Sequence, residues 1–177
     1  TDFLRLKEEG GILNRYNIVD YVNGIAPGVF VIFTTKLAEI HNQLEYLNMG
    51  SGPNYCLYRP YHLTSLETPI TIFEACVNGE ATIAPTKGAI ADTIAIAKKD
   101  LKAGERLDSI GGYTVYGSIE EHKIAKEQNL VPIGLIDRDT KVIRDIKKDE
   151  PIAYHMLELN TDTAIYKLRQ LQDKVMG

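Results

Sequence analysis

The chain has 177 residues, of which 44% are hydrophobic and 25% are charged, and its formal net charge at pH 7 is -4. This length and balance are those of a globular protein with one domain or two small ones. Acidic and basic residues are interspersed, and no apolar run approaches the ~18 residues of a membrane-spanning helix. Neither nucleic acid nor a membrane is therefore an expected partner.

The cysteines indicate the cellular location of the chain, and its first residues indicate whether it is a whole protein. Cys56 and Cys76 have no Cys or His partner at metal-ligand spacing, so we expect no disulfide framework, no metal site and a reducing, cytoplasmic location. The opening TDFLRLKEEGG has neither an initiator Met nor the apolar core of a signal peptide. The sequence is therefore expected to be part of a longer protein.

Strand and helix patterns alternate in the first half of the chain. VFVIFTT at residues 29–35 is apolar nearly throughout, which is typical of a strand covered on both faces. Apolar stripes of helical period predict helices at residues 37–47 and 66–77, with Thr64 or Ser65 in position to cap the second. These elements predict a small α/β unit.

The segment between the two predicted helices concentrates side chains that can carry chemistry. It reads GSGPNYCLYRPYHLTSLETP at residues 50–69. Pro60 restricts Arg59 to an extended backbone, which predicts a stiff loop that can position a substrate. Arg59 can fork onto a carboxylate or phosphate, and His62 can exchange a proton near neutral pH. Arg59 and His62 are the candidate catalytic residues.

Three further side chains of this segment are candidate substrate-binding residues. Tyr58 and Tyr61 can donate hydrogen bonds, and Glu67 can orient His62 or Arg59. A structural interpretation of the same residues stays open. In it, Arg59 ties the loop to Glu67 or to backbone carbonyls, the tyrosines are core rings, and His62 is a satisfied structural histidine.

The second half of the chain predicts short strands and two helices. DTIAIAKKDL at residues 92–101 alternates like a strand, and LVPIGLID at residues 130–137 predicts another. Ser118 and Glu121 have the spacing of a capping box that opens a helix. A last helix is predicted from about residue 160 to residue 176, with Thr161 as its N-cap. The side chains predicted to face the core from this helix are Ile165, Leu168, Leu171 or Gln172, and Val175.

A weak internal repeat runs through this second half. KKDLKAGERLDSI begins at Lys98, and IRDIKKDEPIAYH begins at Ile143, 45 positions later. Each copy has a basic residue, an aspartate, an aliphatic residue, a lysine-bearing turn and a glutamate, with another aliphatic residue two positions on. The pattern predicts short strands folded over one another.

Four segments carry a resemblance to a known family: YVNGIAPGVFVI, LEYLNMGSGPNYCLYRPYHL, AKKDLKAGERLDSIGGYTVYG and VPIGL. They resemble the C-terminal half of bacterial homoserine-dehydrogenase-like oxidoreductases. Those proteins carry an N-terminal Rossmann domain and end in a SAF domain, a β-clip module. The resemblance covers nearly the whole chain, and the block at residues 50–63 is its most specific part.

The resemblance implies an α+β fold in three parts. Residues 1–85 would be the substrate-side and dimerisation portion of an oxidoreductase, a small α/β unit. Residues 86–158 would be a mostly-β SAF domain, and residues 159–177 a C-terminal helix. In related modules the loop at Lys98 and Lys99 meets a sugar-like or acidic ligand, so these two lysines are further candidate substrate-binding residues. The alternative for both is a solvated hairpin.

The cofactor expected for such an oxidoreductase has no binding motif in this chain. No G-x-G-x-x-G follows a strand, and Gly50-Ser51-Gly52 follows a predicted helix, with Pro53 removing a backbone donor. We therefore expect NAD(P) in the Rossmann domain of the full-length protein, no cofactor in this fragment, and no activity of the fragment alone. Its role would be to bind a small anionic or polyol-derived substrate.

Two other expectations concern partners and an alternative function. The apolar strand and the amphipathic helices leave more apolar surface than the first unit can cover, which predicts a homo-oligomer. The alternative is a non-catalytic SAF module that binds carbohydrate or protein. It would be similar to a flagellar P-ring chaperone or to an accessory domain of a sugar-acid dehydratase.

Overall fold

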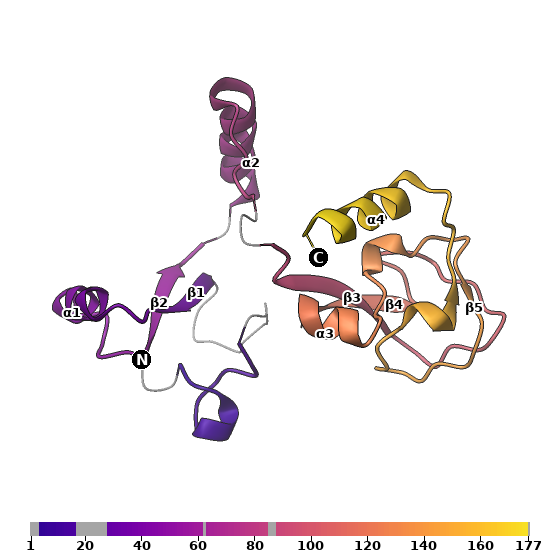
Figure 1. Cartoon of the computed structure of the whole chain (residues 1–177), viewed down its shortest axis with the longest axis horizontal. Helices are drawn as coiled ribbons and strands as arrows, with labels where there is room; N and C mark the ends of the chain where they lie inside the picture. Colours follow the sequence, from indigo (N-terminus) through magenta and orange to yellow (C-terminus); the bar gives the residue numbers. More distant parts are fainter. Residues whose placement is uncertain (1–3, 17–27, 62, 85–87, 177) are drawn as a thin grey trace. The chain divides into compact units, whose positions relative to one another are not determined.

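The chain divides into two compact units in a computed structural model that describes residues 4–16, 28–61, 63–84 and 88–176. The first unit comprises Thr1–Tyr16 and Tyr21–Ala84, and the second comprises Asn17–Asp20 and Pro85–Gly177. Helices and small antiparallel sheets occur in both units (Figure 1). The fold is therefore α+β, as predicted.

The first unit is built on a two-stranded antiparallel sheet. Strand β1 (Val29–Thr34) pairs with β2 (Asn54–Arg59), so that Val29 lies opposite Arg59 and Thr34 opposite Asn54. Helix α1 (Ala38–Tyr46) connects the two strands, and a 3-10 turn, η1 (Lys7–Glu9), precedes them. Part of the predicted loop at residues 50–69 is thus a strand, because its extended backbone finds a partner in β1.

Helix α2 (Thr64–Phe73) follows β2 and continues into a π-helical turn, η2 (Glu74–Asn78). Gly79 ends the helix with a φ of 69°, in the left-handed region. The predicted cap is wrong, because the N-cap position is Leu63 and no side chain makes a capping hydrogen bond there. Thr64 instead begins the helix.

The first unit buries little of its apolar surface. Among its described residues, Leu4, Gly52, Asn54 and Tyr55 are buried. β1 is not covered on both faces, since 58% of Val31 is exposed. The predicted helical stripes exist but face solvent: Leu37, Ile40 and Leu47 around α1, and Leu66, Ile70, Phe73 and Val77 on α2 and η2.

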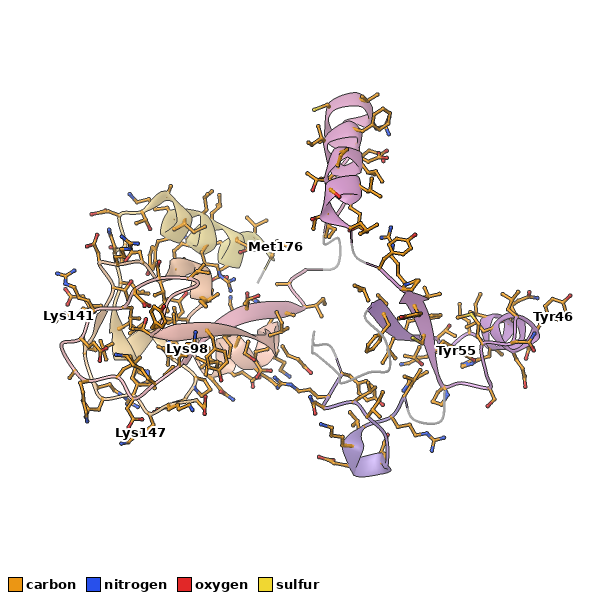
Figure 2. The ribbon with its side chains drawn as sticks, turned by 180° about the vertical axis from the view of Figure 1, so that it is seen from behind. Tyr46, Tyr55, Lys98, Lys141, Lys147 and Met176 are labelled. Atoms are coloured by element: carbon orange, nitrogen blue, oxygen red, sulfur yellow. The ribbon has the colours of Figure 1, made fainter. Side chains whose placement is uncertain are left out.

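His41 joins α1 to β2 and to the residue that follows β1. Its Nε2 lies 2.8 Å from the carbonyl oxygen of Thr35, and its Nδ1 lies 2.6 Å from the hydroxyl of Tyr55. Because a carbonyl only accepts, Nε2 donates to Thr35, and in the neutral ring Nδ1 accepts from Tyr55. Tyr55 projects from β2 (Figure 2) and is fully buried.

The second unit holds a continuous apolar core beneath a β-ribbon. β3 (Ala91–Ala97) pairs antiparallel with β4 (Val115–Glu121), and α3 (His122–Glu127) follows and packs against β3 (Figure 1). Two-residue strands β5 (Lys141–Val142) and β6 (Leu157–Glu158) form a second ribbon. The core includes Leu101, Val115, Val131, Val142, Ile146 and Ile152. The remaining elements are η3 (Ile133–Leu135), η4 (Tyr154–Met156) and α4 (Ala164–Met176).

The sequence repeat is a structural repeat with approximate two-fold symmetry. Leu101 and Ile146, equivalent positions, exchange two backbone hydrogen bonds of 2.9 and 3.0 Å. Around them, bonds recur in pairs related by the 45-residue offset. Gly104 N donates to Val142 O at 2.7 Å, and Asp149 N donates to Ala97 O at 2.8 Å. The two copies therefore fold back on each other around the Leu101–Ile146 pair.

Two local predictions in this unit are wrong because long-range strand pairing overrides a local pattern. Ser118 lies in β4 opposite Ile94, and Glu121, at the N-cap of α3, makes no side-chain cap. The predicted strand at residues 130–137 is instead two isolated bridges, at Leu130 and Pro132, followed by η3.

Helix α4 presents a different face to the unit than the sequence predicts. Its apolar stripe is exposed, from 53% at Ile165 to 74% at Val175, and so does not face the core. Thr163, rather than Thr161, caps the first turn, because its Oγ1 accepts the backbone N–H of Tyr166 at 3.3 Å. The inward face carries Tyr166 and the ionic side chain of Arg169.

Candidate functional site

The end of β2 and the first turns of α2 bring three of the predicted site residues together. Arg59 is the last residue of β2, and Pro60 ends the strand. Arg59 Nη1 lies 2.5 Å from Glu67 Oε1. The guanidinium carbon of Arg59 also lies 4.9 Å from the ring centroid of Tyr61, a cation–π distance. Arg59, Tyr61 and Glu67 therefore form one cluster.

This cluster lines an open cavity of about 370 Å³. Val29 and Ile70 supply its apolar wall, and the remaining lining residues are Thr71 and Thr82. The volume lies at the small end of the range for ligand pockets, which run from about 300 to about 1,000 Å³. The site therefore suits a small molecule that carries an anionic group.

Arg59 is paired in this structure but remains able to bind an anion. Its side chain is 53% exposed, and within the described residues its anionic partner is Glu67. An exposed ion pair is worth only about 0–1 kcal/mol, whereas a carboxylate or phosphate that takes two guanidinium N–H groups gains two charge-assisted hydrogen bonds. An incoming anion can thus displace Glu67 from Arg59 or bind the guanidinium beside it.

Tyr58 does not join the cluster. Adjacent residues of a strand point to opposite faces, so Tyr58 faces away from Arg59. Its ring lies against Gly28, where an added Cβ would come within 2.6 Å of Tyr58 Cε2. His62 lies outside the described residues. Tyr58 and Tyr61 are each about half exposed, so the interpretation of both as core rings is wrong, and Tyr55 is the core ring.

Lys98 and Lys99 lie in the second unit and contact their own hairpin. Lys98 Nζ donates to the carbonyl of Gly112 at 3.1 Å and lies 5.9 Å from the ring of Tyr113. Lys99 is paired with Glu105, and its hydrogen bond is the main cause that lowers the pKa of Glu105. Both contacts lie within the hairpin, as the solvated-hairpin alternative would have them, and a role of these lysines in substrate binding stays a prediction.

The glycines before β2 do not fit a dinucleotide. Gly52 has a φ of 75°, and a Cβ there would come within 2.7 Å of the Tyr55 hydroxyl and 3.2 Å of His41 Nδ1. Packing against Tyr55 therefore explains the glycine. A pyrophosphate cradle needs backbone N–H groups at a helix N-terminus, and this segment leads into a strand. In the described part of the chain, no three His, Cys, Asp or Glu side chains gather as metal ligands either.

The sequence left part of the cavity lining unidentified. Thr71 lies four residues after Glu67 on the same face of α2, so helical spacing could have found it. Val29 and Thr82 come from the start of β1 and from the segment after η2. No local pattern connects them to Arg59, because their place depends on strand pairing and on the path of the chain after the helix.

Comparison with known proteins supports an oxidoreductase. Residues 1–68 match the protein family described as Oxidoreductase DRL, catalytic domain. The matched segment contains Arg59, Tyr61 and Glu67 and ends one residue after Glu67. A comparison of the chain with curated proteins finds no match. Across the described residues, no helix has the length and apolar character needed to cross a membrane.

Proposed function

We propose that this chain is the substrate-side portion of an NAD(P)-dependent, homoserine-dehydrogenase-like oxidoreductase. Its substrate would be a small hydroxy acid, sugar-derived acid or phosphate. One observation carries the proposal: the Arg59–Tyr61–Glu67 cavity lies inside the segment that matches an oxidoreductase catalytic domain. The cavity has a cation for the anionic group of such a substrate and a volume suited to a small molecule.

Each residue of the cluster has a role that follows from its geometry. Arg59 binds the carboxylate or phosphate through the guanidinium N–H groups that Glu67 does not occupy. Glu67 fixes the guanidinium from one side, and the Tyr61 ring supports it from 4.9 Å. His62, three positions after Arg59, assists proton transfer to or from the reacting hydroxyl or carbonyl.

The redox step belongs to a group that this chain does not hold. NAD(P) supplies a hydride acceptor or donor, and in this proposal a Rossmann domain of the same protein binds it. The packing of Gly52 against Tyr55 supports this placement of the cofactor site outside the chain. The chain's own part is to bind the anionic end of the substrate and hold its reactive carbon toward the nicotinamide.

We assign the second unit to the SAF class of β-clip modules, in a cytoplasmic homo-oligomer. The approximate two-fold repeat around Leu101 and Ile146 and the short folded-back ribbons support this assignment. The exposed apolar side chains of β1 and α2 support oligomerisation, because a sheet of two strands is marginally stable without further cover.

The test uses the full-length protein with NADPH and a panel of small hydroxy acids, their carbonyl counterparts and sugar phosphates. Arg59→Ala should lower kcat/KM for the best anionic substrate by about 100-fold, since charge-assisted hydrogen bonds are worth about 1.5–3 kcal/mol each. Arg59→Lys should recover part of this loss. Arg144→Ala, which removes an arginine paired with Glu150 in the second unit, is the matched control.

The outcomes separate substrate binding from a purely structural role. NADPH affinity should be unchanged in Arg59→Ala. For uncharged analogues of the substrate, kcat/KM should be the same in Arg59→Ala as in the parent protein. Unchanged kinetics with anionic substrates would reject the role of Arg59. Calorimetry on the 177-residue chain alone should show no NADH or NADPH binding at millimolar concentration, and turnover by that chain would reject the assignment of the cofactor to another domain.

A further inference from the structure

The cavity at Arg59 has a lining whose charges balance. Of the described residues that line it, Arg59 is the only cation and Glu67 the only anion. The two side chains are paired at 2.5 Å, and the Arg59 side chain stays about half exposed, so a ligand in the cavity can still reach the guanidinium. Such a ligand meets one positive group with a negative group beside it.

This charge balance favours a carboxylate over a phosphate ester. A phosphate ester carries a charge of about −1.5 to −2 at pH 7, and protein sites that hold it gather donors from several Arg or Lys side chains or from a helix N-terminus. The described lining offers Arg59 as its one cation, and the second phosphate charge would meet Glu67. A carboxylate has one charge, and its two oxygens match two N–H groups of one guanidinium.

Two branched aliphatic side chains flank the ion pair. Val29 lies opposite Arg59 in the β1–β2 register, so both side chains leave the same face of the ribbon, with their Cβ atoms about 4.5–5.5 Å apart. Ile70 follows Glu67 by three positions in α2, so these two are neighbours on the helix surface. Both aliphatic side chains line the cavity and are about half exposed. The carbons next to a carboxylate on Arg59 would therefore lie against Val29 and Ile70.

The position of this aliphatic wall determines which carbon chain fits. A sugar acid has hydroxyls on the carbons beside its carboxylate, and hydroxyls placed against Val29 and Ile70 would lose water without gaining a partner. Methyl and methylene groups at the same place remove apolar surface from water instead. Elsewhere in the lining, Thr71 and Thr82 carry hydroxyls that can bond a hydroxyl or carbonyl of the ligand. A ligand with an aliphatic part and few hydroxyls therefore fits best.

We propose that this cavity selects a monocarboxylate with a branched aliphatic chain and a hydroxyl or carbonyl group, and that Val29 and Ile70 determine this specificity. The inference rests on the proposed function and narrows its substrate to one class, disfavouring phosphate esters and sugar acids. A cavity of about 150 Å³ holds a six-membered carbon ring, so one of about 370 Å³ has room for a branched acid of about five carbons. Arg59 binds its carboxylate, and the aliphatic branch covers Val29 and Ile70.

The test is a titration of the isotopically labelled 177-residue chain, followed by amide chemical shifts, with no nicotinamide present. The probes are the branched hydroxy acid 2-hydroxy-3-methylbutanoate, the sugar acid threonate and the phosphate ester glycerol 3-phosphate. The branched acid should give saturable shifts at residues around Val29, Arg59 and Ile70, with a Kd on the order of 1 mM for so few atoms. Threonate and glycerol 3-phosphate should each bind at least about tenfold more weakly.

Four variants test the aliphatic wall. Val29→Thr and Ile70→Thr keep a branched side chain and add a hydroxyl, so each should reduce the preference for the branched acid over threonate by about fivefold or more. Val31→Thr and Ile72→Thr are the matched controls. Val31 lies on the same face of β1 as Val29, Ile72 lies in α2, and neither lines the cavity. Both controls should bind all three probes like the parent chain.

A further pair of variants tests the charge balance. Glu67→Gln removes the negative group beside Arg59, so binding of glycerol 3-phosphate should strengthen by at least about tenfold, and by more than binding of the branched acid. Glu74→Gln is the matched control, because Glu74 bonds Asn78 in the turn that continues α2 and does not line the cavity. An equal gain for both probes in Glu67→Gln would overturn the charge argument.

The remaining outcomes separate this inference from the proposed function. Threonate or glycerol 3-phosphate binding as tightly as the branched acid, or shifts that never saturate with any probe, would overturn the inference. So would NADPH-dependent turnover of a phosphate ester or a sugar acid, but not of branched acids, by the full-length protein, and the proposed function would then stand. The expected binding preference in a full-length protein that shows no NADPH-dependent turnover would instead overturn the proposed function.

Discussion

Asp100 and Asp145 accept backbone hydrogen bonds from each other's turn. Lys148 N donates to Asp100 Oδ1 at 2.9 Å, and Ala103 N donates to Asp145 Oδ1 at 3.0 Å. The two aspartates are equivalent residues of the 45-position repeat, and so are the two donors. These bonds lower the pKa of Asp100, with the Lys148 bond as the largest cause. They also lower that of Asp145, where Lys102 contributes most. In each copy of the repeat, the turn is therefore held by an aspartate of the other copy.

The reciprocal bonds predict that the two aspartates contribute about equally to the stability of the second unit. Asp100→Ala and Asp145→Ala should each lower the urea midpoint of unfolding, followed by far-UV circular dichroism, and by similar amounts. Asp139→Ala is the control, because Asp139 pairs with Arg106 at 3.4 Å on the surface and its carboxylate accepts no backbone N–H from the described residues. An unchanged urea midpoint in one of the two variants would show that the two reciprocal hydrogen bonds do not contribute equally to stability.

A second prediction concerns acid stability and rests on Asp108. Its carboxylate accepts hydrogen bonds from Thr114 Oγ1 and N and from Tyr113 N, and these lower its pKa from 3.8 to about 2. Because the folded pKa is lower than the unfolded one, the stabilisation is complete above pH 3.8 and is lost as the pH falls toward 2. Asp108→Asn should be less stable than the parent at pH 7, with the difference closing between pH 4 and 2.

The measurement for Asp108 is a series of urea unfolding curves at fixed pH values. Asp162→Asn, at an exposed carboxylate beside Lys167, should keep a constant difference from the parent across the same range. A stability difference between Asp108→Asn and the parent that stays constant down to pH 2 would show that the charge of the carboxylate does not stabilise the segment at Tyr113 and Thr114.

The polar attachment of α4 gives a third prediction. Arg169→Ala leaves the mostly buried Asp92 without its bidentate partner and should cost about 3 kcal/mol of unfolding free energy. The adjacent Leu168→Ala should cost less than about 0.5 kcal/mol in the monomer, since that side chain is 61% exposed. Urea unfolding compares the two. A larger loss from Leu168→Ala at low protein concentration would mean that the apolar stripe faces the core after all.

The fourth prediction separates backbone strain from crowding at two glycines of the first unit. Gly52→Ala and Gly79→Ala both place a Cβ at positive φ, which costs about 1–2 kcal/mol. At Gly52 the Cβ also meets the buried Tyr55 hydroxyl at 2.7 Å, whereas at Gly79 nothing lies within 4 Å. Hydrogen exchange of the β2 amides should therefore accelerate by at least about tenfold more in Gly52→Ala. Equal acceleration would remove Tyr55 as the cause.

The features predicted correctly are those that a short window of sequence determines. The helical period located α1 and α2, the apolar run located β1, and the repeat identified the two halves of the second unit. Glu67 was also expected to contact either His62 or Arg59, and it pairs with Arg59. Except for the repeat, whose copies lie 45 positions apart, neighbouring residues carry the signal in each case.

The errors occur where a distant partner decides the outcome. Ser118 and Glu121 have a capping pattern, but both belong to β4, where they pair with residues of β3. In α4, Asp92, 77 positions before Arg169, makes the polar face the inner one. Val29 reaches the Arg59 cavity only because β1 and β2 pair in a particular register. No local window contains these relationships.

The interlocked repeat also constrains how a newly made chain acquires its shape. Because the turn at Ala103 is held by Asp145 and the turn at Lys148 by Asp100, neither copy has its native support until both have left the ribosome. The first copy must wait for about 45 further residues of synthesis, exposing Leu101 and Leu107 meanwhile. A ribosome stalled before Ile146 would therefore carry an open, protease-sensitive segment rather than half a module.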